Sequence, residues 1–373
     1  MNKTTKIILG VVILAVIVLI VVFYKPAPRK AIKIGAILPL TGKVAGPGQD
    51  LKNALNLALG DINKNENLIE LVYEDDQCDA KKAVDAYNGL VNVKGVKIII
   101  GALCSPSTLA IAPLAEKDKV ILITPASAAE SISNAGDFIF RNHTKDSDEA
   151  RALVNFVLKK RYKNLAIMYS ISNEWAIQRK EYFLKYLQEG GGVVKIEVSF
   201  ADDQRDFATE LTKIKNKEKE IDAVYLIVSI TAVPARIIKQ MAELGIQKQV
   251  FGDKSWATSE FLDTVGKLSE GIIYTEAEFK RSTSPEFWDR YKEKFNKEPA
   301  SWAAQGYDSL MILSQIIFDK KCGTDTTCIK DELYKTKDYL GAAGKTSFDE
   351  NGDAIKAITI KVIKNGQFVP YED

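Results

Sequence analysis

Short β-rich runs alternate with helical runs along most of this 373-residue chain, and this order constrains its fold more than any other feature. Residues 32–39 are typical of a strand, and residues 51–62 of the helix that follows it. After about residue 145 the alternation begins again. Strands that alternate with helices of about 10 to 15 residues predict βαβ units and parallel sheets. Since about 350 residues are too many for one compact core, we expect two α/β lobes.

The other expected elements follow the same order until the tail of the chain. Further strands are expected at residues 68–74, 97–100, 120–123, 138–141, 165–169, 193–200 and 223–228 and near 250 and 272, and further helices at 80–91, 146–160, 174–188, 207–214 and 232–244. In the tail, two helices (285–295 and 302–318) precede a β pair at 346–348 and 354–363. Ligands of open parallel sheets bind beyond the carboxyl ends of the strands. The loops in question are 39–50, 103–108, 124–131, 170–175 and 252–256.

Residues 7–24 form an apolar run without any charged side chain. As a helix, this run would extend about 27 Å, close to the ~30 Å hydrocarbon core of a bilayer. A cleaved signal peptide is the alternative, since Lys3 and Lys6 resemble its positively charged start. However, the run is long for a signal peptide, a Lys-Pro-Ala-Pro-Arg-Lys linker follows instead of small residues, and no cysteine is present for a lipid anchor. We therefore expect an N-terminal transmembrane helix, with anchor and linker over residues 1–30.

Four cysteines indicate on which side of the membrane the body lies. Cys78 and Cys104 each follow a strand-like stretch, and Cys322 and Cys328 bracket a short polar loop. An even number of cysteines without a CxxC pair, in a chain with one histidine, favours two disulfides over a zinc site. The economical pairing joins residue 78 with 104 and residue 322 with 328. Disulfides imply an oxidising compartment, so we expect an extracellular or periplasmic body.

Enzyme chemistry finds little support in the sequence. His143 is the only histidine, so any Ser–His or Cys–His pair would need it. It precedes an acidic helix start, where a surface or hinge histidine is the simpler interpretation. No phosphate-binding Gly-x-x-x-x-Gly-Lys loop and no dinucleotide fingerprint occur, and Asp75, Asp76 and Asp79 are more typical of a solvated loop than of a metal site. We predict no catalytic residue, no metal and no cofactor.

The distribution of charge argues against a nucleic-acid partner. Residues 1–24 contain two lysines and no acid, so the remainder of the chain has 49 basic and 49 acidic residues. A formally neutral body gives no electrostatic reason to bind a phosphate backbone.

Several short motifs carry a family resemblance. Residues 35–42 (Gly-Ala-Ile-Leu-Pro-Leu-Thr-Gly), 75–79 (Asp-Asp-Gln-Cys-Asp), 101–108 (Gly-Ala-Leu-Cys-Ser-Pro-Ser-Thr) and 123–126 (Ile-Thr-Pro-Ala) occur in order. Arg141 with Asp-Ser-Asp at 146–148, and Gln-Gly-Tyr-Asp at 305–308, follow later. Together these motifs resemble the leucine/isoleucine/valine-binding branch of the type I periplasmic solute-binding proteins. The resemblance covers essentially residues 31–363.

This resemblance implies a specific architecture. Two Rossmann-like lobes with parallel sheets would be joined by a three-strand hinge and would close around a small ligand. The first lobe would comprise residues 31–144 and 279–345, and the second lobe residues 145–278 and 346–373. The resemblance also implies the disulfide between Cys78 and Cys104, because family members pair cysteines in these two loops. The Cys322–Cys328 pair rests on spacing alone.

Only some of the family's ligand-binding residues in the first lobe have a counterpart in this chain. In amino-acid binders of this family, a serine after the second cysteine and backbone groups of the Thr-Pro-Ala loop hold the ligand carboxylate. These positions are Ser105 and Ala126 here. The family has a threonine two residues after the alanine, but this chain has Ala128 there, which lacks a hydroxyl. The neighbouring Ser127 is the candidate to supply the hydroxyl instead.

The second lobe departs from the family at a charged position. The family places an acid that neutralises the ligand ammonium in the loop after the strand near residue 250. This chain has Lys254 there, and Asp253 is the alternative after a one-residue shift. A buried ammonium beside a lysine would cost several kcal/mol. If Lys254 faces the cleft, the ligand should lack a free ammonium or carry extra negative charge, as a carboxylate, an aromatic acid or an amide does.

Tryptophans complete the predicted site. Trp175 matches the aromatic that follows the strand at 165–169, Trp302 matches a pocket aromatic, and Trp256 would add an apolar wall. The resemblance thus implies an anchored receptor that delivers a small ligand to ABC permease subunits. The alternative is a sensory ectodomain that reports occupancy to a separate signalling partner.

Overall fold

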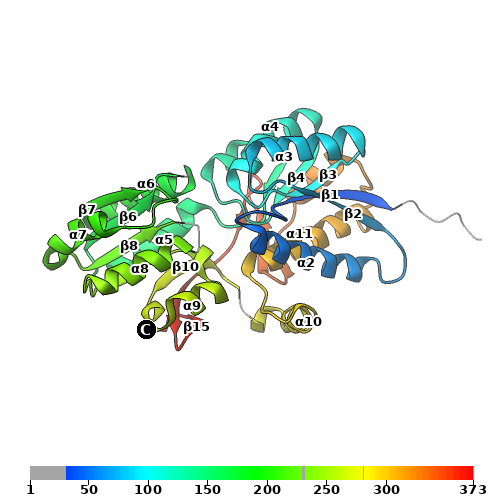
Figure 1. Cartoon of the computed structure of the whole chain (residues 1–373). Helices are drawn as coiled ribbons and strands as arrows, with labels where there is room; N and C mark the ends of the chain where they lie inside the picture. Colours follow the sequence, from blue (N-terminus) through cyan, green and yellow to red (C-terminus); the bar gives the residue numbers. More distant parts are fainter. Residues whose placement is uncertain (1–30, 173, 229–231, 280, 373) are drawn as a thin grey trace, which may run out of the picture.

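The computed structural model describes residues 31–372, except 173, 229–231 and 280. Two α/β halves lie side by side (Figure 1). The expected membrane anchor lies outside the described residues. Among the residues that are described, no helix is both long and apolar enough to span a bilayer.

The first half is built on a five-stranded sheet. Its strands are β1 (Ile32–Leu38), β2 (Ile69–Asp75), β3 (Ile98–Gly101), β4 (Ile121–Thr124) and β5 (Ile139–Arg141). They lie in the order β2-β1-β3-β4-β5, and every neighbouring pair is parallel. β3 and β4 are buried along their whole length, which explains their continuous apolar sequences. The helices that follow β1, β2 and β3 are α2 (Ala45–Ile62), α3 (Ala80–Asn88) and α4 (Ser105–Asp118).

The second half contains a seven-stranded sheet in the order β15-β14-β10-β9-β8-β6-β7. The parallel strands are β6 (Asn164–Ser170), β7 (Val193–Phe200), β8 (Ala223–Ile227), β9 (Gln249–Phe251) and β10 (Ile273–Ala277). Two antiparallel strands, β14 (Ile358–Lys364) and β15 (Gln367–Pro370), extend the sheet beyond β10. The helices of this half are α5 (Asp146–Lys159), α6 (Glu174–Glu189), α7 (Ala208–Asn216), α8 (Ala232–Glu243) and α9 (Ser259–Val265).

The segment between β10 and β14 returns to the first half. It contains α10 (Pro285–Phe295), α11 (Ser301–Phe318), α12 (Thr326–Tyr334) and a small antiparallel sheet of β11 (Tyr339–Gly341), β12 (Gly344–Phe348) and β13 (Ala354–Ile355). α11 lies against α2, and Phe348 and Ala354 belong to the same buried core as the strands of the first sheet. Residues 346–355 therefore pack with the first half, and the expected boundary at 345/346 is too early.

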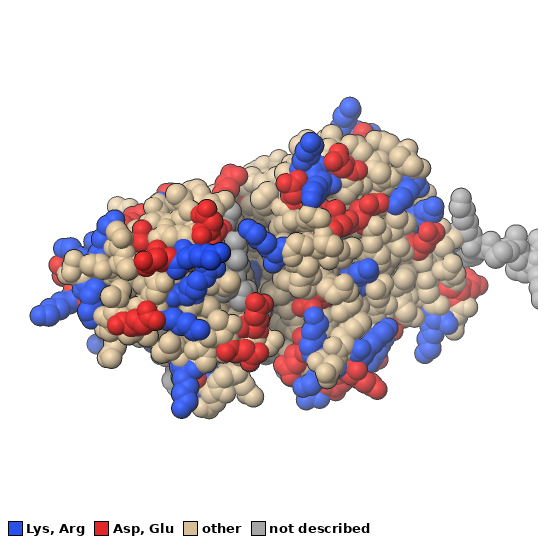
Figure 2. All heavy atoms as spheres, in the orientation of Figure 1, with Lys and Arg blue, Asp and Glu red and all other residues tan. Residues whose placement is uncertain are grey.

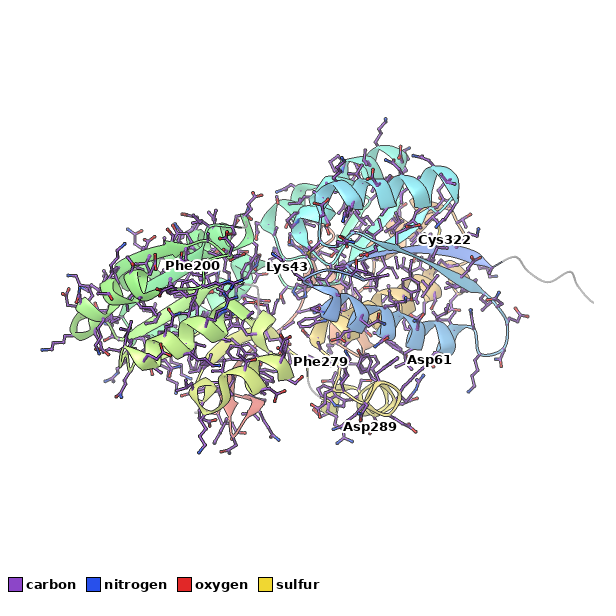
Figure 3. The ribbon with its side chains drawn as sticks, in the orientation of Figure 1. Lys43, Asp61, Phe200, Phe279, Asp289 and Cys322 are labelled. Carbon is purple, nitrogen blue, oxygen red and sulfur yellow. A yellow bond between two sulfur atoms is a disulfide. The ribbon has the colours of Figure 1, made fainter. Side chains whose placement is uncertain are left out.

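The chain passes between the halves three times. The passages follow β5, β10 and β13, and after each of these strands the next main helix or strand belongs to the other half. In Figure 3, Phe279 marks the second passage, while Asp61 and Cys322 lie in the first half and Phe200 in the second.

Both expected disulfides are present, and all four cysteines are paired. The Cys78–Cys104 bond ties the loop after β2 to the residue that precedes α4, with the Cα atoms 5.5 Å apart. The Cys322–Cys328 bond closes a six-residue separation at the start of α12. The sequence suggested a polar loop between the two cysteines, but α12 begins before the second one, so Cys328 is helical.

Two helices begin where the sequence predicted loops. α2 starts at Ala45, because a proline is tolerated in a first turn and because Gly48 allows close approach: a Cβ there would collide with the carbonyl of Pro39. The predicted loop 103–108 contains the first turn of α4, a helix with Pro106 at its start and Pro113 inside it. The prolines obscured the helical pattern of α4 in the sequence.

Candidate functional site

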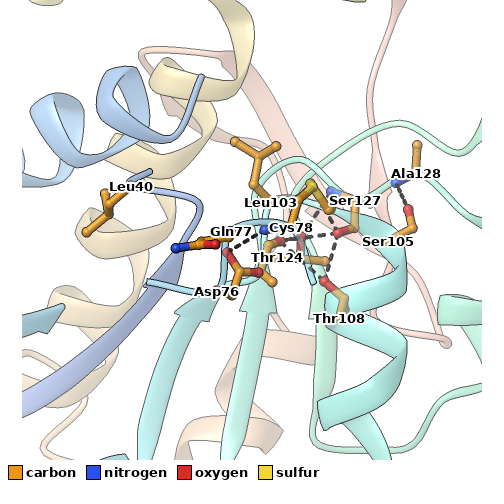
Figure 4. The surroundings of a disulfide bond; sticks show 12 residues. Leu40, Asp76, Gln77, Cys78, Leu103, Ser105, Thr108, Thr124, Ser127 and Ala128 are labelled. Atoms are coloured by element: carbon orange, nitrogen blue, oxygen red, sulfur yellow. Dashed lines mark hydrogen bonds between the residues drawn. A yellow bond between two sulfur atoms is a disulfide. The ribbon is translucent and has the colours of Figure 1, made fainter. Parts of the chain in front are cut away.

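Ser105 and the loop after β4 meet at the carboxyl edge of the first sheet. Ser105 is the first residue of α4, and its Oγ accepts a hydrogen bond of 3.2 Å from the backbone N–H of Ala128 (Figure 4). The N–H of Ala129 donates to the same oxygen, also at 3.2 Å. Ala126, at the tip of the loop, is half-buried, and its N–H lies 3.4 Å from the Thr124 hydroxyl. The structure therefore brings Ser105, Ala126 and Ala128 together.

The Ser127 side chain points into the interior of the first half. Its side chain is buried, with Oγ 2.7 Å from the Thr108 hydroxyl and 3.2 Å from the carbonyl of Ala102 (Figure 4). Buried backbone carbonyls require hydrogen-bond donors, and the Ser127 hydroxyl serves that need inside the first half. The expectation that Ser127 replaces the hydroxyl absent at Ala128 is therefore wrong.

The loop also connects the first half to the second. The carbonyl of Ala128 accepts a hydrogen bond of 3.0 Å from the N–H of Asp146, the first residue of α5. The Asp146 carboxylate in turn accepts hydrogen bonds of 2.9 Å from Trp175 Nε1 and from Arg179 Nη1 on the same oxygen, Oδ1. Burial raises the pKa of Asp146 to about 6, although the Arg179 charge opposes this shift.

Arg179 is the centre of a buried ionic cluster in the second half. Its guanidinium binds Asp146, donates to Glu149 Oε2 at 3.2 Å and to the Tyr225 hydroxyl at 3.2 Å, and lies 3.9 Å from Asp253 Oδ2. Asp253 thus faces Arg179, and its side chain is only 3% exposed. The alternative in which Asp253 supplies an acid to the ligand does not agree with this orientation.

Lys254 forms a partly buried ion pair with Glu149 and contacts the only histidine. Its Nζ binds Glu149 Oε1 and lies 2.6 Å from His143 Nε2, while His143 Nδ1 lies 2.7 Å from Gln305 Oε1. Burial, assisted by the Lys254 charge, lowers the pKa of His143 to about 3. The neutral imidazole therefore accepts a hydrogen bond from Lys254 and donates one to Gln305. Burial alone would raise the pKa of Glu149, but Lys254 and Arg179 lower it to about 2.

His143 lies between β5 and α5, in the first passage between the halves. The interpretation as a hinge histidine agrees with this position, whereas a surface location is wrong because the side chain is buried. Through His143, Gln305 of α11 in the first half is connected to Lys254 of the second half.

The tryptophans differ in their surroundings. Trp256 is buried, its Nε1 donates to the carbonyl of Val228 at 2.6 Å, and its ring packs against Phe261. It belongs to the core of the second half, so the expected role as a pocket wall is wrong. Trp302 is half-buried at the start of α11 beside a cluster that includes Phe279, and its Nε1 has no hydrogen-bond partner among the described residues.

Known proteins with this organisation identify the family. The model of the family described as periplasmic binding protein matches residues 31–367. This chain belongs to that family.

Individual relatives agree with the family match. The Leu/Ile/Val-binding protein of Escherichia coli K12 is 28% identical over 264 residues, which cover 68% of this chain and 70% of that protein. The solved leucine-binding protein of Thermotoga maritima superposes with a TM-score of 0.84 at 28% identity, covering 92% and 98% of the two chains. A branched-chain amino acid transporter substrate-binding protein of Streptococcus pneumoniae, solved with isoleucine, gives 0.81 at 26% identity, covering 92% and 100%.

The predicted resemblance to the leucine/isoleucine/valine-binding branch is thereby confirmed, as is the prediction that the chain is a binding protein and not an enzyme. The sequence did not single out Glu149, Arg179 and Gln305, which the structure places in contact with the predicted residue Lys254 or with its neighbours. One pattern in the sequence could have indicated that Arg179 is buried: it lies on the same face of α6 as Ala176 and Phe183, which are also buried.

Proposed function

We propose that this chain is the extracytoplasmic receptor of an ABC uptake transporter and that it binds a small ligand between its two halves. The observation that carries the proposal is that residues from the facing edges of both halves contact one another. The Ala128–Asp146 bond and the Gln305–His143–Lys254 contacts link the two sheet edges. Figure 2 shows a furrow between the halves on the face that it displays, and Lys43 lies beside this boundary in Figure 3.

The proposed ligand contacts combine polar groups with apolar walls. Ser105 and the backbone of Ala126 and Ala128 would hold the polar end of the ligand, and Lys254 would face it from the second half. Trp175 and Trp302 would line the apolar part. The relatives that bind leucine, isoleucine or valine support an amino acid-like molecule, and a carboxylate or an amide offers the same acceptor groups. No reaction follows binding; contacts with both halves would stabilise a closed arrangement.

The cellular setting belongs to the same proposal. Residues 1–30 would anchor the chain in the membrane, with the body on the extracellular or periplasmic side and permease subunits as partners. Two disulfides support an oxidising compartment. We propose lobe boundaries of 31–144 with 279–355 and 145–278 with 356–373, which follow the packing of Phe348 and Ala354.

A thermal-shift screen with amino acids, carboxylates and amides tests this function. A ligand at about 100 times its Kd should stabilise the protein by about 2.7 kcal/mol, because it binds only the folded state. Small-angle scattering with and without that ligand should show a smaller radius of gyration when it is bound. If no compound of the three classes raises the melting temperature, the proposal is wrong.

A further inference from the structure

We propose that Lys254 and Glu149 act together as the selectivity element of the site, and that the ligand presents an acceptor or a negative charge to Lys254 and carries no free ammonium. This inference rests on the proposed function, because it assumes that the ligand binds beside Lys254. It identifies the charge class of the ligand from the way the ionic cluster is arranged.

The carboxylates and the arginine of the cluster are more deeply buried than its lysine. The side chains of Asp146, Glu149, Asp253 and Arg179 are at most 3% exposed, whereas that of Lys254 is 12% exposed. The second carboxylate oxygens of Asp146 and Asp253 are also inaccessible to solvent. Lys254 therefore has the most exposed side chain of the cluster, and a molecule that approaches the cluster meets this side chain before any carboxylate.

Lys254 has one N–H group left for a ligand. Of its three N–H groups, one binds Glu149 Oε1 and a second is directed to His143 Nε2. The described residues provide no further acceptor for the third. A carboxylate, carbonyl or hydroxyl oxygen would complete the coordination of Nζ, and a carboxylate would add a charge-assisted bond.

Glu149 cannot serve a ligand ammonium in this arrangement. Its Oε1 is bound by Lys254 and Thr144, and its Oε2 is bound by Arg179. An ammonium placed beside Lys254 would lose its hydration, find no accessible carboxylate and meet a like charge. The role of Glu149 is to fix the position of Lys254 and to balance its charge.

The cluster as a whole contains three carboxylates and two cations, so its excess charge is negative. This excess lies on Asp146 and Asp253, which flank Arg179 in the interior of the second half. Contact geometry, and not the total charge, would therefore decide which ligand group is accepted, because Lys254 has the most exposed side chain of the cluster.

Matched ligand pairs measure this selectivity directly. Each pair consists of an amino acid and its deaminated counterpart: alanine and propanoate, leucine and 4-methylpentanoate, phenylalanine and 3-phenylpropanoate, glutamate and glutarate. Titration calorimetry on the wild-type protein should give a Kd at least about tenfold lower for the deaminated member of the pair that binds best. Because this ratio is measured on the wild type, a variant that does not fold leaves the test intact.

Two variants then test whether Lys254 and Glu149 cause this ratio of Kd values. Lys254→Gln should bring the ratio close to one, and Lys254→Glu combined with Glu149→Gln should invert it in favour of the amino acid. Lys361→Gln is the control, since Lys361 is 14% exposed and forms a 2.6 Å ion pair with Glu276 in the same half. This control should keep the wild-type ratio.

The outcomes separate the inference from the proposed function. If the wild type binds the amino acid more tightly, or if both Lys254 variants keep the wild-type ratio, the inference is overturned while the receptor function stands. If no member of any pair binds to the wild type, the proposed function fails for this ligand class and the inference fails with it.

Discussion

The two halves of the molecule share one architecture, a sheet of mainly parallel strands flanked by helices, yet they organise the edges that face each other in different ways. Around Ser105, the first half uses neutral groups: the Ser105 hydroxyl, the amides of Ala128 and Ala129, and the buried Ser127 hydroxyl, next to a disulfide. The same sheet also has a buried ion pair, between Arg141 of β5 and Asp353. The second half uses charges around Arg179.

This difference shows that a sheet edge can be held in place by quite different interactions. The neutral hydrogen bonds and the disulfide around Ser105 involve no charged group. The ionic edge depends on every partner, because removing one member of a buried ion pair leaves an uncompensated charge. The comparison predicts that the two halves respond differently to substitution, to reduction and to pH.

Arg179→Met should have the largest effect. The substitution leaves Asp146 and Glu149 without their shared buried counter-charge, so the free energy of unfolding should fall by about 3 to 5 kcal/mol. Urea unfolding measures the loss. The control is Arg281→Met, since Arg281 is 63% exposed and its pair with Asp289 should contribute less than about 1 kcal/mol. Equal losses in the two variants would show that charge does not hold the second edge.

Removal of the disulfides tests the covalent part of the first half. The Cys78→Ala/Cys104→Ala variant opens a link with a separation of 26 residues and should lose about 3.5 kcal/mol by the loop-closure relation. Cys322→Ala/Cys328→Ala opens a separation of six residues and should lose about 2 kcal/mol. Thermal unfolding of the two variants compares them. The reverse order would mean that loop entropy is not the main contribution.

The His143 contacts at the junction should make stability depend on pH. The folded-state pKa of about 3 lies below the ordinary value of 6.5, so the unfolded state binds a proton more readily between these values. Stability therefore rises with pH across this window, and acidification from pH 7 to pH 5 should cost the wild type roughly 2 kcal/mol more than His143→Gln.

Asp146, whose raised pKa acts in the opposite direction, is present in both proteins, so the difference between them isolates His143. Because the chain has a single histidine, NMR titration of its ring also gives the pKa directly. A value near 6.5 would contradict a neutral, buried imidazole between Lys254 and Gln305.

Trp175→Phe should have the smallest effect. It keeps an aromatic ring but removes the N–H that donates to Asp146, and Arg179 still binds that carboxylate, so about 1 kcal/mol of stability should be lost. Trp302→Phe is the matched control, since Trp302 is also half-buried and its Nε1 has no partner among the described residues. Urea unfolding should show a smaller loss for the control. Equal losses would indicate that ring size, and not the hydrogen bond, matters at both positions.

Most elements could be predicted from the sequence because local patterns govern them. The strand at 193–200 and the helix at 285–295 have the expected bounds as β7 and α10. α4 could not be predicted, because it contains two prolines and a helix accepts proline only at particular positions. The grouping of the candidate site residues was partly predictable: Ser105, Ala128, Trp175 and Lys254 lie on one connected set of hydrogen bonds and ion pairs, while their role toward a ligand stays a prediction.

By itself, the sequence determined the α/β class, the cysteine pairs and the family, because these depend on periodicity, composition and motif order. Only the tertiary structure decided which side chains face the junction. Ser127 and Trp256 turn into the core, while Glu149 and Lys254, 105 residues apart, form an ion pair. The physical reason is that burial and charge pairing depend on how distant elements pack, and no local pattern records that packing.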